Sequence, residues 1–150
     1  MYNTMRTKPW SNWLVLIVCV LFSGAVAADT FVIVGPSKLG IEEIQRGSVV
    51  RVFKGVQREL NGKSVAFAIR KERRVSDEFT RIHYKSSWFD YLDDLNLAFY
   101  QQRLRSLPPI QSLDEFIALN AHDPRYLIYA TVSELKEVSL PPTLRVMWIE

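Results

Sequence analysis

An uncharged stretch at residues 13–28 divides the chain into two parts under different constraints. It follows Arg6 and Lys8, begins with ten apolar residues and ends in small side chains. A helix that crosses a bilayer needs roughly 20 apolar residues, about twice the length of this apolar run. A basic start, a short apolar middle and a small-residue end are typical of a cleavable secretory signal, which predicts cleavage after Ala27 or Ala28. The alternative is an uncleaved membrane anchor, because the small residues extend the stretch toward spanning length.

This interpretation makes residues 1–28 a signal peptide and residues 29–150 one folded domain that is exported. The one cysteine, Cys19, lies in the predicted signal, so the exported domain has neither a disulfide nor a reactive thiol. Two of the 19 basic residues also lie there, which leaves the domain nearly neutral against its 16 acidic residues. Binding to a phosphate backbone needs a clear basic excess, so nucleic acid is not expected as a partner.

The apolar pattern of the domain predicts strands that alternate with helices. Short runs rich in β-branched residues predict four strands, at residues 30–34, 65–69, 126–130 and 144–149. Helical spacing predicts helices over residues 41–53, from Ser76, over residues 88–104 and from Ser112. Residues 134–143 are expected to form a loop between the last two strands. This order favours an α/β sandwich, with helices on both faces of a central sheet.

Local signals indicate where some of these elements begin and turn. Asn61-Gly62 is a strong turn signal before the second strand. Ser76 is expected to cap its helix, because its hydroxyl can accept a hydrogen bond from a free amide of the first turn. Ser112 is followed three residues later by Glu115, which is the spacing of a capping box.

Five motifs follow one another between Val32 and Ala130. They are residues 52–55 (Val-Phe-Lys-Gly), 61–65 (Asn-Gly-Lys-Ser-Val), the polar stretch 70–79, the segment 108–116 with its two prolines, and residues 123–129. In this order they resemble the phosphate-type periplasmic substrate-binding proteins of ABC transporters, especially their short, single-domain relatives. The match covers one lobe of a two-lobed class. The resemblance implies a single-lobe, periplasmic-binding-protein-like sandwich with a central mixed sheet and helices on both faces.

The resemblance implies non-catalytic binding of a small oxyanion such as phosphate, together with a membrane transporter. Ser37 follows the first strand, where open α/β sheets place their ligands. Arg70 and Arg73 can offer forked, charge-assisted hydrogen bonds to an oxyanion. With Ser76, these residues form the predicted ligand-binding site.

In the phosphate-binding members of this family, a glycine- and serine-rich turn delivers backbone amides to the oxyanion, and this sequence lacks that turn. Residues 72–76 stand there instead, followed by the acidic Asp77 and Glu78. The arginines therefore also fit a solvated cluster of mixed charge, and Ser76 also fits a purely structural cap. A second function stays open, an envelope accessory or interaction protein that keeps the fold without the ligand. A second copy, as in a homodimer, or a protein partner would supply the missing lobe.

No catalytic constellation is visible in the sequence. His83 and His122 are about 40 residues apart, and the predicted domain has no cysteine to join them in a metal site. No glycine-flanked nucleophile accompanies a histidine and an acid, so we predict neither enzyme activity nor a cofactor. Trp88 and Tyr91 are expected in the core or, if exposed, in an interface.

Overall fold

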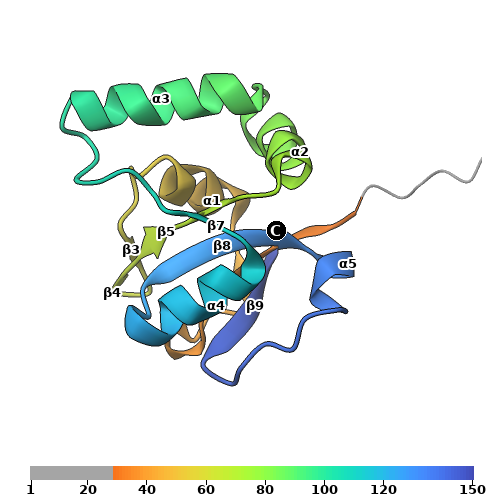
Figure 1. Cartoon of the computed structure of the whole chain (residues 1–150). Coiled ribbons are helices and arrows are strands. Elements are labelled where there is room, and N and C mark those ends of the chain that lie inside the picture. The colour runs from red at the N-terminus through yellow and green to blue at the C-terminus, as the bar shows by residue number, and fades with distance from the viewer. Residues whose placement is uncertain (1–28) are drawn as a thin grey trace, which may run out of the picture.

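The central sheet is built around the first strand of the domain. The computed structural model describes residues 29–150, so the predicted signal and Cys19 lie outside the described residues. Within residues 29–150, five strands pair in the order β2-β9-β1-β8-β5 (Figure 1). Their bounds are Phe31–Pro36 for β1, Glu43–Ile44 for β2, Ala66–Phe67 for β5, Tyr126–Thr131 for β8 and Leu144–Ile149 for β9.

One strand of this sheet runs against the others. β1 pairs antiparallel with β8, where Phe31 lies opposite Thr131, and antiparallel with β9, where Val32 lies opposite Trp148. The edge strands β5 and β2 run parallel to β8 and β9, respectively. The carboxyl end of β1 therefore lies at the opposite end of the sheet from the carboxyl ends of β5 and β8.

Alternate residues of the strands face two separate apolar layers, as the two-residue period of a strand requires. Ile33 and Tyr129 belong to a cluster with buried residues of three helices, α1, α2 and α3. Val34 and Ile128 belong to a second cluster with α4 and the partly buried Leu135 of α5. Figure 1 shows α1 to α3 on one side of the sheet and α4 on the other. The bounds are Arg46–Phe53 for α1, Arg73–Tyr84 for α2, Trp88–Tyr100 for α3, Leu113–His122 for α4 and Val132–Leu135 for α5.

Short elements complete the fold. Strands β3 (Glu59–Leu60) and β4 (Lys63–Ser64) form a hairpin around Asn61 and Gly62, whose φ angles of 51° and 71° suit a tight hairpin turn. Strand β6 (Ile69–Arg70) pairs in parallel with β7 (Ile110–Gln111), and a single turn of 3₁₀ helix, η1, spans Ser37–Leu39.

The predicted α/β class, the mixed sheet and its helices on both faces are confirmed. The capping box of Ser112 and Glu115 is also present at the start of α4. The predicted cap at Ser76 is wrong, because α2 already begins at Arg73 and Ser76 lies buried within its first turns. The second strand is divided into β5 and β6 at Ala68, and α3 ends at Tyr100, before Leu104.

The aromatic residues of α3 divide between core and surface. Trp88 and Tyr91 are buried, so neither is free for an interface. Tyr100, the last residue of the helix, is 80% exposed. No helix among residues 29–150 combines the length and apolar character needed to cross a bilayer.

Candidate functional site

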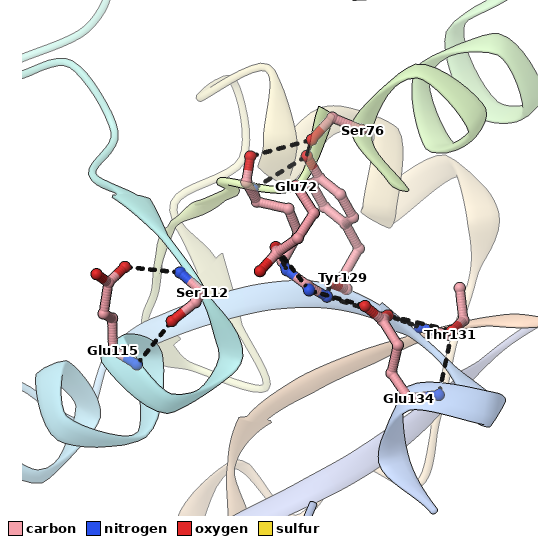
Figure 2. A network of polar contacts seen from close by, with 8 residues as sticks. Glu72, Ser76, Ser112, Glu115, Tyr129, Thr131 and Glu134 are labelled. Carbon is pink, nitrogen blue, oxygen red and sulfur yellow. Dashed lines mark hydrogen bonds and ion pairs between the residues drawn. The ribbon is translucent and has the colours of Figure 1, made fainter. Parts of the chain in front are cut away.

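The Arg70 side chain lies at the centre of a buried polar network between α2, β8 and α5. Only 2% of the side chain is exposed. Its two terminal nitrogens donate to both carboxylate oxygens of Glu134, at 2.8 and 3.1 Å, and its Nε donates to Glu72 Oε2 at 2.8 Å. Figure 2 shows Glu72 and Glu134 with the groups around them. A forked pair of this kind is among the strongest hydrogen-bond arrangements of arginine, so the guanidinium is held by the chain itself.

The buried hydroxyls beside Arg70 are paired with each other. Ser76 Oγ lies 2.7 Å from the Tyr129 hydroxyl and donates to the Arg70 carbonyl at 3.1 Å. The Tyr129 hydroxyl accepts a hydrogen bond from the Arg70 amide at 3.2 Å. The Tyr129 ring stacks on Phe79 with centroids 3.9 Å apart, which fixes the position of the hydroxyl. These groups therefore bind one another rather than pointing into an open cavity.

Glu134 is oriented by its own helix. Thr131 and Glu134 form a capping box at the start of α5, in which Glu134 Oε2 accepts from the Thr131 amide at 2.9 Å (Figure 2). The same carboxylate thus caps a helix and binds Arg70.

The pKa values of the network residues show how burial and hydrogen bonding set their charges. Burial opposes the positive charge of Arg70. The hydrogen bonds from Arg70 to Glu134 and Glu72, together with the negative charges of these two residues, outweigh burial and raise the pKa of Arg70. Burial also favours the neutral form of Glu134, yet its hydrogen bonds with Arg70 and Thr131 bring its pKa below the ordinary value. Burial raises the pKa of Tyr129 to about 12. The Glu134 carboxylate and the guanidinium therefore stay ionised and the phenol stays neutral at neutral pH.

Arg73 lies on the exposed side of α2, outside this network. Its side chain is 64% exposed, and its Nε lies 3.5 Å from Asp77 one turn later. Its guanidinium also lies 4.6 Å from the centroid of the Phe89 ring, within the range of a cation–π contact. Arg73 is thus the member of the predicted site that matches a solvated charge cluster.

Ser37 lies at the other end of the sheet from Arg70 and Ser76. It follows β1, and its amide donates to the Thr143 carbonyl at 2.8 Å. Because β1 runs against β8, the strand rise separates Ser37 from the Arg70 network by roughly 15 to 20 Å. The four predicted residues therefore do not surround one cavity, and only Arg70 and Ser76 are in direct contact.

Sequence reasoning missed Glu134 and Tyr129 as members of the network. The sequence predicts a loop at residue 134 and indicates only a strand position for Tyr129. The Thr-x-x-Glu spacing of Thr131 and Glu134 is a capping-box signature that could have indicated the short helix. The contacts of Arg70 with β8 and α5 depend on long-range packing, which no local pattern encodes.

No group of three or more His, Cys, Asp or Glu residues within residues 29–150 is arranged to hold a metal ion. His83 lies near the ends of β1 and β9, where neither ring nitrogen finds a hydrogen-bond partner among the described residues. It packs on Phe79, with ring centroids 4.7 Å apart. The His83 ring therefore packs against an aromatic side chain, without the hydrogen bonds that would position a catalytic base.

Comparisons with known proteins give one similar structure. No family model matches the sequence, and no match is found among curated proteins. The crystal structure of an ABC-type phosphate transport receptor from Vibrio cholerae is similar to this chain with a TM-score of 0.48 and 13% sequence identity. The match covers 81% of this chain and 46% of that receptor, so the chain spans about half of the receptor's length. This likeness assigns neither a family nor a ligand to the chain.

Proposed function

We propose that this protein is a non-catalytic, single-lobe binding protein of the periplasm that acts through a protein partner, without an oxyanion at Arg70. One observation carries the proposal. The guanidinium that would hold the oxyanion is already bound by the carboxylates of Glu134 and Glu72. An incoming oxyanion would add negative charge to a site that already holds two carboxylates, and it would have to displace one of them.

The periplasmic location rests on the predicted secretory signal, and the binding role rests on the ordered motifs that resemble one lobe of a transport receptor. A receptor of that class closes two lobes around its ligand. A protein surface that faces residues 29–150 would supply the second wall.

Isothermal titration with phosphate, sulfate and acetate tests the proposal. We expect no binding heat at millimolar concentrations of any of the three. Saturable binding of phosphate to the unaltered protein would refute the accessory function and support a receptor function. Pull-down from an envelope extract, followed by reconstitution with the purified partner, tests the positive half of the proposal. The reconstituted complex should form equally well with and without phosphate.

The exposure of Glu72 favours a second candidate, an oxyanion-binding protein with a displaceable internal carboxylate. The Glu72 side chain is 42% exposed, whereas Arg70 is 2% exposed. An incoming phosphate could replace Glu72 while Glu134 stays in place, with Arg70, Arg73 and Ser76 as the ligand-binding residues. Ser37 would lie too far away to contribute to the same ligand.

The variant Glu72→Ala separates the two candidates. If Glu72 acts as a displaceable internal ligand, its removal should turn weak phosphate binding into measurable binding. Glu78→Ala is the matched control. It removes a carboxylate of α2, the helix that follows Glu72, and this carboxylate does not contact Arg70. Absence of phosphate binding in both variants would remove the second candidate.

A further inference from the structure

The outer edge of β5 has a gap at Phe67. The amides of Ala66 and Ala68 donate to the Arg125 and Leu127 carbonyls, so these residues pair with β8. Phe67 alternates with them, and its amide and carbonyl point away from β8. Neither main-chain group has a hydrogen-bond partner within residues 29–150. Phe67 is only 8% exposed, so this is an unpaired donor and acceptor at a nearly buried position.

Two prolines explain why the gap is there. The outer edge is paired on both sides of Phe67, where the Val65 amide donates to Arg58 and the Ile69 amide donates to Pro109. The parallel register of β6 and β7, with Ile69 opposite Ile110, places Pro108 level with Phe67. The next residue, Pro109, has no amide hydrogen to give to the Phe67 carbonyl. The ladder that starts at β7 therefore cannot extend back along β5.

A cavity of about 360 Å³ opens at this gap. Its walls are formed by β5, the end of the β3–β4 hairpin and the segment that leads from α3 to β7. The apolar part of the lining includes Val52, Phe67, Leu104 and Pro108. The volume lies at the lower end of the range of ligand sites, which suits a few residues of an extended chain.

The rim of the cavity is basic. Arg58, Arg105 and Arg125 line it, against one carboxylate, that of Glu59. Arg125 is paired with Asp123 at 2.6 and 2.7 Å, whereas Arg58 donates to main-chain carbonyls. Arg105 is exposed and forms no ion pair or hydrogen bond in the part of the chain that the structure describes. A carboxylate in the cavity would therefore find two guanidiniums, those of Arg58 and Arg105, that form no ion pair within the described residues.

We propose that this cavity binds an extended acidic peptide segment of a protein partner. The peptide main chain would pair with the amide and carbonyl of Phe67 alone, because Val65 and Ile69 on either side are already paired along this edge. A carboxylate of the peptide would lie against Arg105 and Arg58, and an apolar side chain would cover the floor of the cavity. The inference rests on the proposed role in protein binding, and it names the surface and the chemistry of the partner.

The first experiment measures hydrogen exchange of individual amides by NMR. In the free protein, the Phe67 amide should exchange faster than those of Ala66 and Ala68, which are hydrogen-bonded to β8. Equal protection of the three amides would mean that Phe67 has a partner, and it would overturn the proposal.

The second experiment selects binders from a library of random displayed decapeptides. Peptides are selected on the unaltered protein, and those that also bind the Arg105→Glu variant are removed. This selection should enrich sequences with Asp or Glu beside β-branched or aromatic residues. The synthetic form of the most enriched peptide should protect the Phe67 amide. Its affinity should fall by about tenfold in Arg105→Glu, because a like charge would then face its carboxylate. Arg74→Glu, which reverses an exposed charge on α2, is the control and should leave the affinity unchanged.

Three outcomes of this second experiment would also overturn the inference: no enrichment of acidic sequences, binding that leaves Phe67 unprotected, or equal effects of the two charge reversals. N-methylation of the peptide amide that pairs with Phe67 should abolish binding, whereas loss of an apolar contact alone would only weaken it. A partner complex that forms unchanged with Arg105→Glu would leave the proposed function standing and remove only this cavity as its site.

Discussion

The unpaired imidazole of His83 should make the stability of the protein depend on pH. His83 packs between Phe79 and Phe31, and both of its ring nitrogens lack hydrogen-bond partners among residues 29–150. It also lines a cavity with Asp29, Arg46 and Glu150. Burial, with smaller contributions from the positive charges of Arg46 and Lys85, lowers the pKa of His83 from 6.5 to about 4.

The sign and size of the effect follow from this pKa. The unfolded chain binds a proton on this side chain near pH 6.5, whereas the folded protein binds it only near pH 4. The folded state therefore has its full stability above pH 6.5, loses stability as the pH falls toward 4, and loses no more through this group below that. The pKa difference corresponds to an upper limit of about 3 kcal/mol. The cavity admits solvent that screens the charge, which reduces the expected loss to about 1–2 kcal/mol.

His83→Leu should remove this dependence. The variant should also be more stable than the unaltered protein at pH 7.5 by about 1 kcal/mol, because it no longer buries unpaired nitrogens. Urea denaturation at several pH values between 7.5 and 4.5 measures both effects. His122→Gln is the control, because His122 is exposed and its removal should leave the pH profile unchanged. A pH profile of His83→Leu that matches that of the unaltered protein would refute the reasoning, as would an NMR titration that places the pKa of His83 near 6.5.

Two further groups of substitutions test the network and the core by urea denaturation. Glu134→Gln should cost about 2 kcal/mol, because it leaves the buried charge of Arg70 with Glu72 alone. This difference should disappear as the pH falls below 4.5, because the stabilising form of Glu134 is the ionised one and its pKa is lowered in the folded protein. Gly35→Ala should cost about 1–3 kcal/mol, since a Cβ atom there would lie 2.2 Å from Leu127 Cδ2. Gly47→Ala should instead raise stability by about 0.5 kcal/mol, because Gly47 lies in α1 and a Cβ atom there would make only an ordinary contact, with Arg51 Nη1 at 3.6 Å. A neutral result for Gly35→Ala or a loss of stability for Gly47→Ala would contradict the packing described for these sites.

Most of the long elements could be predicted from the sequence because their signals are local. The β-branched runs mark β1, β8 and β9, and the serine-to-glutamate spacing marks the start of α4. The short strands β2 and β7 escaped prediction because two residues are too few to show a period. They exist only because longer elements bring them together.

The candidate site was harder to predict because it depends on strand direction. Ser37 and Ser76 each fit the rule that ligands lie beyond carboxyl strand ends, but β1 runs against the strands that end near Ser76. The burial of Arg70 could not be predicted either. A run of charged residues has the pattern of an exposed cluster, and the pattern does not show which of its side chains is buried. The predicted signal peptide and the division at residue 28 stay predictions.

The central place of β1 has a consequence for the way the protein is made. Both neighbours of this strand come from the far end of the chain, at Tyr126–Thr131 and Leu144–Ile149. The sheet cannot assemble while the ribosome still holds those residues, and such distant pairings form slowly. The nascent polypeptide therefore cannot form this sheet until the residues of β9 have been synthesised.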